Sequence, residues 1–450
     1  MILIGVFFIC FLIFLMLFFY KKSQNIFNPM SYIILFFLIR NTMFLLKVCS
    51  NPDSMNSYLP VIITDPDLLL LKYFLFQTIF FSVFSGSYCI FAQKRLLYYT
   101  VNIKSRNDSE SIYIIRNILY LSFIFSLITF MLYFFKVGSL YEIINNFAYR
   151  TEHIDDNIFI QLSVRLAPLV LFSALYLYIK KQIKYITFIM YSLYVVISLL
   201  GFGSRTLAFT PILGGFVIWS ILTGNAKIKT FKKFLLPTIC LFPFLIIVSD
   251  LRKPQKVDLL FSEPVEYFLS IFEDDSSESF VAEQLSSVRT SLFILNHYNE
   301  YNMWYGKSII DLLYAPIPRK FFANKPPVDT GRYITAAAIG QDFQPPTPLS
   351  KLPPYGWPPG SMELGYINFG LFGIMLIGIL HGFILSYICN KCIMKIEIKT
   401  FFYIVIYFYA IQLFNLTNSG LFTFLTRVAT FYILYKFSSF FINKKRYFIQ

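Results

Sequence analysis

Long apolar runs recur along most of this chain of 450 residues and constrain its fold more than any other feature. A helix needs about 20 mostly apolar residues to cross the hydrocarbon core of a bilayer. Eleven segments approach or exceed that length, at roughly 2–20, 30–48, 68–92, 112–135, 160–179, 184–201, 207–223, 234–249, 362–389, 400–417 and 421–442. We therefore predict an all-α polytopic membrane protein with about 11 transmembrane helices.

The composition supports this fold class. Apolar residues make up 57% of the chain and charged residues 14%, whereas ordinary globular proteins have about 45–50% and about 25%. So few charges cannot cover a surface that faces water, so soluble, disordered and nucleic-acid-binding classes are excluded. We read the net charge of +15 as the bias of cytoplasmic loops toward Lys and Arg, and expect no nucleic-acid partner.

The basic residues also predict an orientation. They recur in every second loop, at Lys21-Lys22, Lys94-Arg95, Lys180-Lys181, Lys227–Lys233, Lys391–Lys399 and Lys444–Arg446. The intervening segment 49–67 has no Lys or Arg. By the positive-inside rule the basic loops are cytoplasmic, which predicts an external N-terminus, a cytoplasmic C-terminus and an odd number of spans.

One polar segment, residues 250–361, separates the eighth and ninth expected spans on the external side. Unstructured loops beyond about 12–15 residues are uncommon and usually functional or disordered. Apolar spacing at 268–272 and 292–295 indicates amphipathic helices, whereas the Pro-rich part from Pro316 to Pro359 cannot be continuous helix. We expect a folded cap, which divides the chain into 1–249, 250–361 and 362–450.

Several arginines are expected near the outer edge of the membrane: Arg165, Arg205, Arg252 and Arg427. Only Arg40 falls in the middle of an expected span. For Arg165 and Arg427, contact with lipid phosphate is as good an explanation as a role in binding substrate. Arg205 lies in a short Gly-rich turn that permits close backbone approach, and its guanidinium suits bidentate phosphate binding.

A second group of cations lies in the Pro-rich part of the cap, at Arg319, Lys320, Lys325 and Arg332. Because prolines limit the freedom of the chain, these side chains form a candidate anion clamp. The alternative interpretation is a solvated basic turn.

The candidate proton acceptors are Glu363, His297 and Asp250. A structural role explains Glu363 as well as catalysis does, because the helix dipole favours an acidic residue at the start of the ninth span. Ser361 is placed to cap that helix. His381 lies mid-span and is expected to pack against or bond a neighbouring helix. The sequence has no nucleotide-binding or zinc-hydrolase motif, so we expect neither a metal nor a cofactor.

Three sequence motifs and the layout of spans resemble a known family. They are the turn Gly203-Ser-Arg205-Thr, the external-loop pair Ile317-Pro-Arg319 and Lys325-Pro, and the ninth-span opening Gly360-Ser-Met-Glu363-Leu-Gly-Tyr-Ile-Asn368-Phe-Gly370. Together they resemble the bacterial O-antigen polymerases (Wzy-type oligosaccharide repeat-unit polymerases).

The resemblance implies a GT-C-like membrane glycosyltransferase on the periplasmic side of the inner membrane. Its substrates are oligosaccharide repeat units carried on undecaprenyl diphosphate, and a chain-length regulator and a flippase are its expected partners besides the bilayer. Such chemistry requires cations at the diphosphate leaving group and removal of a proton from an acceptor hydroxyl. Sugar faces are expected to stack on aromatic side chains of the cap, at Tyr314, Tyr355 and Trp357.

Two other functions remain open at this point. An O-antigen ligase uses the same lipid-linked donor and the same architecture, with a lipid A-core acceptor. A flippase or transporter of lipid-linked oligosaccharides also needs many spans, but we expect it to carry charges deep along its path and to lack a large cap.

Overall fold

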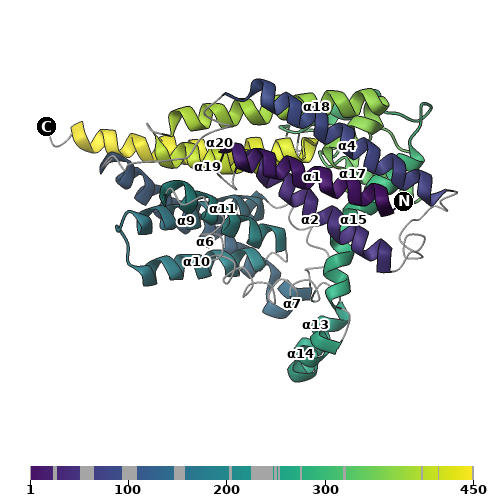
Figure 1. The fold of residues 1–450 in the computed structure, drawn as a ribbon. Coiled ribbons are helices and arrows are strands. Elements are labelled where there is room, and N and C mark those ends of the chain that lie inside the picture. The colour runs from purple at the N-terminus through teal and green to yellow at the C-terminus, as the bar shows by residue number, and fades with distance from the viewer. Residues whose placement is uncertain are drawn as a thin grey trace. The chain divides into compact units, whose positions relative to one another are not determined.

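The computed structural model describes residues 2–23, 28–50, 65–93, 109–145, 158–201, 205–223, 247, 251, 254–273, 276–317, 321–396, 399–413 and 415–447. Within these ranges every regular element is a helix and no strand occurs (Figure 1). The predicted all-α fold class is therefore confirmed for the described part of the chain.

Five described helices are long and apolar enough to cross a membrane: α1 (Ile2–Ser23), α2 (Pro29–Ser50), α4 (Pro66–Phe91), α6 (Ser109–Val137) and α18 (Ser361–Lys395). Four others have shorter apolar segments: α9 (Ile158–Ile179), α10 (Tyr185–Leu200), α11 (Arg205–Thr223) and α19 (Thr400–Ile411). The last helix is α20 (Asn418–Tyr447). These helices define a membrane-embedded protein. The expected span 234–249 lies outside the described residues except for residue 247, and the total of 11 stays a prediction.

The chain forms two compact units, each assembled from segments far apart in the sequence. Unit 1 contains residues 1–99, 281–391 and 409–426, and unit 2 contains residues 100–280, 392–408 and 427–450. The sequence-based division into 1–249, 250–361 and 362–450 describes membrane topology, whereas these units reflect packing, so that division stays a prediction.

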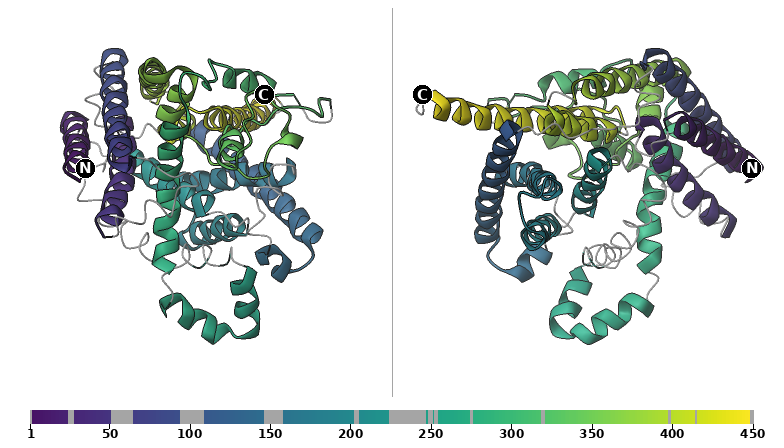
Figure 2. Two further views of the ribbon diagram at one scale, coloured as in Figure 1. Left: turned by 90° about the vertical axis from the view of Figure 1, so that its right-hand side faces the viewer. Right: turned by 60° about the vertical axis from the view of Figure 1, so that its left-hand side comes forward.

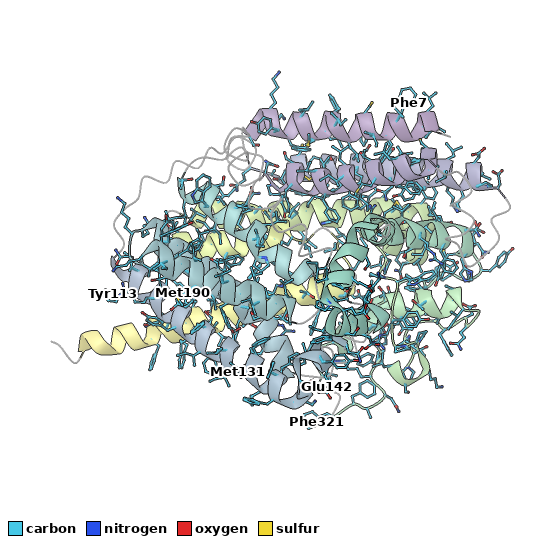
Figure 3. All side chains as sticks on the ribbon, turned by 90° about the horizontal axis from the view of Figure 1, so that it is seen from below. Phe7, Tyr113, Met131, Glu142, Met190 and Phe321 are labelled. Carbon is cyan, nitrogen blue, oxygen red and sulfur yellow. The ribbon has the colours of Figure 1, made fainter. Side chains whose placement is uncertain are left out.

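In unit 1, α1 packs against α2 and α4 (Figure 1). Phenylalanine rings fill the contacts, with ring centroids 5.6 Å apart for Phe8 and Phe74 and 4.9 Å apart for Phe37 and Phe81. On the outward side of α1, Phe7 is 66% exposed and points away from its neighbours (Figure 3). Such a face is suited to lipid contact.

Helix α18 packs closely on α4 because two glycines one turn apart remove side-chain bulk. A Cβ atom added at Gly382 would lie 2.7 Å from the Phe84 carbonyl oxygen, and one added at Gly378 would lie 3.4 Å from that of Phe80. The Ser87 hydroxyl donates a hydrogen bond to the Ile379 carbonyl at 2.8 Å. Small residues at this spacing allow membrane helices to approach each other.

The expected packing role of His381 is confirmed. Its ring is fully buried and stacks on Phe84 at 4.5 Å, and its Nε2 atom lies 2.7 Å from the Leu413 carbonyl oxygen. This histidine therefore ties α18 to the segment that follows α19.

Helix α18 is broken near its start, which the continuous expected span 362–389 did not anticipate. Phe369 (φ −148°, ψ 25°) and Gly370 (φ 58°, ψ −140°) depart from helical geometry. A short helix over 361–368 is thereby folded against the start of a longer one over 371–395, and Gly365 meets Gly373 backbone to backbone. The positive φ of Gly370 explains why glycine is needed at this break.

Unit 2 is built around α9, which packs against α6, α10 and α11 (Figure 2). Three smaller helices also belong to this unit: α7 (Leu140–Asn145), α13 (Pro254–Ser262) and α14 (Pro264–Glu273). The Tyr141 hydroxyl of α7 donates to Asp258 Oδ1 of α13 at 2.7 Å. The helix expected over 268–272 is confirmed as part of α14.

The remainder of the expected cap belongs to unit 1. Its helices are α15 (Ser276–His297, in unit 1 from residue 281), α16 (Ser308–Tyr314), α17 (Gly331–Ala338) and the short 3-10 helix η1 (Leu349–Lys351). The Pro-rich part is not continuous helix, as expected. Trp304 is 1% exposed, and its ring lies 5.7 Å from those of both Tyr298 and Tyr333. The cap therefore has an aromatic core of its own.

Candidate functional site

Within unit 1, the cap contacts α18 at the break in that helix. Asn368 Oδ1 accepts hydrogen bonds from the Gly306 amide at 3.0 Å and from the Ser308 hydroxyl at 3.1 Å. Asn418 Nδ2 donates to the Ser308 carbonyl at 2.6 Å. Asn368, the asparagine of the motif that opens the ninth span, thus joins the cap to the membrane helix.

Glu363 lies in the first turn of α18 and is 2% exposed. Its Oε1 atom accepts a short hydrogen bond from the hydroxyl of Ser291 on α15. Gly360 leaves room for the carboxylate, because a Cβ atom there would collide with Glu363 Oε2. A cap residue and a membrane-helix residue therefore form this site together.

Ser361 does not cap α18 as expected. It is the first residue of the helix, and its hydroxyl oxygen accepts a hydrogen bond from the Leu416 amide at 2.6 Å. Nearby, Asn415 Oδ1 is buried without a hydrogen-bond partner among the described residues. The loop before α20 is therefore the third segment that contributes residues near Glu363, after α15 and the start of α18.

Unit 1 also contains a buried arginine. Arg40 of α2 is 6% exposed, and its Nη2 atom is 3.5 Å from the Tyr73 hydroxyl, which donates to Asn41 Oδ1 at 2.8 Å. Tyr73 interacts electrostatically with both Arg40 and Glu363. Arg40, the one arginine expected mid-span, and Glu363 thus both act electrostatically on Tyr73.

Arg289 lies two residues before Ser291 and was not predicted. Its guanidinium carbon is 4.9 Å from the ring centroid of Trp357, a residue expected to contact sugar. Trp357 also packs edge-on against Phe293 at 6.0 Å. The available signal was that Arg289 is the single charge between Glu283 and Glu300.

Lys72 is a second cation that sequence reasoning missed. Its Nζ atom donates to the Leu295 carbonyl and to the Tyr366 hydroxyl, at 2.7 Å each. A cation near the last carbonyls of α15 also interacts favourably with the helix dipole. Lys72 lies inside the expected span 68–92, where any charge is costly and usually functional. Its position within a span is therefore the sequence feature that marks it as a candidate functional residue.

Two residues predicted to bind diphosphate donate hydrogen bonds to backbone carbonyls of the cap. Lys325 is 8% exposed, and its Nζ atom donates to the carbonyls of Ala315 at 2.7 Å and Ile317 at 2.8 Å. Arg332 is 9% exposed and donates from Nη1 to the Pro353 carbonyl at 3.2 Å. Burial raises the pKa of the nearby Asp329 carboxyl, which the Gly331 amide and Arg332 partly offset. These contacts stabilise the cap; diphosphate binding by either residue stays a prediction.

Among the other predicted cations, the structure describes the side chains of Arg165 and Arg427. Arg319, Arg252 and the candidate base Asp250 lie outside the described residues, as does the side chain of Arg205, the first residue of α11. Arg165 and Arg427 both belong to unit 2, where they are half-buried and close enough to repel each other.

His297 ends α15 with its ring half-buried and stacked on Phe293 at 5.1 Å. Burial lowers the pKa of this histidine, and Asp342 opposes that shift. Its Nε2 atom is buried and has no hydrogen-bond partner among the described residues. A neutral imidazole is the form that can accept a proton, so the structure leaves His297 as a candidate base.

The two predicted sugar-contacting tyrosines differ in exposure. Tyr355 is 54% exposed, whereas Tyr314 is half-buried against Phe322, with ring centroids 5.4 Å apart. Only Tyr355 therefore offers most of its ring to a ligand.

Asp311 of α16 is a buried carboxyl that was not predicted. It is fully buried, and neither oxygen has a hydrogen bond of normal geometry among the described residues. Burial raises its pKa to about 7, and the nearby Tyr333 hydroxyl lowers it in part. The signal was a lone acid within the apolar run Ile309-Ile-Asp-Leu-Leu313.

No three His, Cys, Asp or Glu side chains gather as metal ligands would within the described ranges. Comparisons with protein-family models, with curated proteins and with solved structures found no match. The residues around Glu363 are therefore the features of the described structure that bear on function.

Proposed function

We propose that this protein is a GT-C-like membrane glycosyltransferase that polymerises oligosaccharide repeat units carried on undecaprenyl diphosphate. The proposal places 11 spans in a bacterial inner membrane, with the N-terminus and the cap on the periplasmic side. The observation that carries it is the buried carboxylate of Glu363, held by Ser291 of the cap at the start of a membrane helix.

The reaction transfers the growing chain to the non-reducing end of a new unit. A hydroxyl oxygen of that unit bonds to the anomeric carbon of the chain, while the bond from that carbon to undecaprenyl diphosphate breaks. The hydroxyl proton passes to a general base, for which Glu363 is the first candidate and His297 and Asp250 are the others. A base at the membrane edge can reach a substrate whose lipid stays in the bilayer.

Cations are needed where the diphosphate departs, and preorganised cations can stabilise such a charge without a metal ion. Arg289 and Lys72 support this role, because both lie on elements that contribute to or contact the Glu363 cluster. Arg205, Arg252 and Arg319 remain proposed ligands of the diphosphate from the sequence. Trp357, beside Arg289, is the proposed sugar platform.

The lipopolysaccharide ladder of a deletion strain tests this function. Complementation with the normal gene should restore long chains, whereas Glu363→Gln or Arg205→Ala should leave single-unit capping with the protein still in the membrane. Glu300→Gln is the matched control, because Glu300 is exposed on the same cap and should restore full chains.

The same ladder separates the alternatives. Loss of all capping, single units included, would indicate an O-antigen ligase or a flippase. Normal chain lengths with Glu363→Gln would remove Glu363 from the reaction.

A further inference from the structure

Helix α16 has its polar side buried and its apolar side exposed, the reverse of a helix on a water-facing surface. Ser308 and Asp311 are 1% and 0% exposed. Ile309, Ile310 and Leu313, which we call the α16 apolar face, are 56%, 37% and 72% exposed. Ile309 and Ile310 lie four and three positions before Leu313, and residues at these spacings share one side of a helix, so this face is continuous.

Large apolar and aromatic side chains continue the exposed surface on both sides of α16. Tyr301 and Tyr305 precede the helix and are 96% and 58% exposed. Ile317 and Phe321 follow it and are 39% and 80% exposed, and Phe321 points away from the ribbon (Figure 3). Tyrosines that flank an apolar surface are typical of the membrane–water interface.

This surface is continuous with that of a membrane helix. Gly306, two residues before α16, lies against the ring of Phe369, because a Cβ atom there would be 3.3 Å from it. Phe369 is 38% exposed, and Leu371 and Phe372, which begin the long part of α18, are 45% and 65% exposed. The Asn368 hydrogen bonds described above fix this junction.

We propose that α16 is an interfacial helix whose apolar face lies in the boundary between lipid headgroups and acyl chains, beside the start of the long part of α18. The partner is the bilayer, because the exposed apolar surface of α16 continues one that already belongs to a membrane-spanning helix. A seven-residue helix with three aliphatic side chains and aromatic flanks suits shallow insertion. The proposal goes beyond the proposed reaction and holds whichever substrate the cap binds.

Interfacial binding of α16 has a consequence for the cap. The segment that leads into α16 bonds Asn368, five residues after Glu363, so lipid contact would hold the cap at a fixed height over α18. The buried side of the helix, with Asp311, then faces the cap interior instead of water.

Photolabelling of the full-length protein tests this surface. The protein is reconstituted in vesicles of phosphatidylethanolamine and phosphatidylglycerol that contain a phosphatidylcholine with a diazirine in its acyl chain, and adducts are located by mass spectrometry. We expect adducts on Ile309–Leu313 at a frequency comparable to those on Leu371 and Phe372. Ile339 and Tyr355, each 54% exposed on the same cap, serve as internal controls and should stay unlabelled.

A matched pair of variants sharpens the result. Leu313→Asp should lose the adducts on α16 and keep those on α18, whereas Leu313→Phe should retain both. Adducts on α18 but none on α16 in the normal protein would overturn the proposal, as would equal labelling of Ile339 and Tyr355. Cross-links from α16 to a second copy or to another protein would also overturn it.

Discussion

At the scale of single residues, Glu363 shows how the fold can keep a carboxylate inside the protein. Burial of an unpaired charge is costly, but the hydroxyl of Ser291 donates to it and the first turn of α18 favours a negative charge. Ser291 Oγ also lies 3.0 Å from the Ser287 carbonyl. The Ser291 hydroxyl has one proton, and donating it to the carboxylate is favoured because charge-assisted hydrogen bonds are stronger than neutral ones.

Ser291→Ala should slow polymerisation because it leaves the buried Glu363 carboxylate without its donor. A hydrogen bond to a charged group contributes about 1.5–3 kcal/mol, so we expect a loss of about tenfold or more in rate. The measurement is the rate at which lipid-linked chains lengthen. Ser287→Ala, one turn earlier on α15, is the control and should retain the normal rate, and an unchanged rate in Ser291→Ala would contradict the role given to Ser291.

Asp311 predicts a dependence of stability on pH. Its pKa is about 7 in the folded protein and about 3.9 in an unfolded chain. Between these values the unfolded chain releases the proton and the folded protein keeps it, so stability should fall as pH rises through this window and level off above pH of about 7. Asp311→Asn should flatten this part of the Tm profile, measured by thermal unfolding in detergent.

The control for Asp311 is again Glu300→Gln, because Glu300 is exposed on the same cap. Its Tm profile should follow that of the normal protein. A profile for Asp311→Asn that falls just as steeply would show that another group causes the dependence.

Single residues also show what sequence patterns convey and what they do not. The motif around Glu363 and Asn368 identified the junction of cap and membrane, because its glycines and polar residues interrupt an apolar run. Lys325 was predicted to bind an anion, yet its ammonium group is directed to two carbonyls that become neighbours only in the folded cap. Charge type is visible in a sequence, whereas the partner of a charge depends on tertiary packing.

At the scale of elements, the length of the apolar runs predicted where the helices lie but not whether each helix is continuous. Ten of the 11 expected spans coincide with a described helix, because each is a long apolar run. The break in α18 was not expected, since the span 362–389 was predicted as one continuous helix across Phe369 and Gly370. The close pairing of α4 with α18 has a signal in the sequence, the Gly378-xxx-Gly382 spacing of small residues.

Gly382→Ala should destabilise the protein because the added Cβ atom would lie 2.7 Å from the Phe84 carbonyl oxygen and 2.8 Å from the Tyr88 amide nitrogen. The helices must shift apart to accept it, at a cost of about 1–3 kcal/mol. The expected result is a lower Tm in detergent. Gly86→Ala on α4 is the matched control, since nothing lies within 4 Å of its added Cβ atom, and its Tm should not fall. Equal Tm values for both variants would contradict the close α4–α18 contact.

At the scale of the whole molecule, two compact units make up a membrane-embedded chain whose described elements are all helices. Its basic loops alternate with loops poor in Lys and Arg. This alternation predicts which loops face the cytoplasm, although the basic segment 94–106 and the segment 51–64, which has no Lys or Arg, lie outside the described residues. The orientation therefore rests on the sequence. It matters for function, because the proposed substrate is presented on the periplasmic side.

Reporter fusions test the orientation directly. Alkaline phosphatase, which is active only outside the cytoplasm, should be active when fused within 51–64 or 318–320 and inactive when fused within 94–106 or after residue 447. The physical reason is the energetic preference for Lys and Arg on the cytoplasmic side. Activity within 94–106, or its absence at 318–320, would place the cap on the wrong side of the membrane for the proposed reaction.

Reconstitution with a defined substrate tests the proposed function most directly. The purified full-length protein is placed in vesicles with undecaprenyl-diphosphate-linked repeat units and a strong metal chelator, and the lipid-linked products are resolved by mass. With the chelator present, we predict that the normal protein forms products of two or more units and releases undecaprenyl diphosphate. The Glu363→Gln variant should form no such products. Repeat units that stay single with the normal protein, or that lengthen only when a divalent metal is restored, would contradict the proposed polymerase.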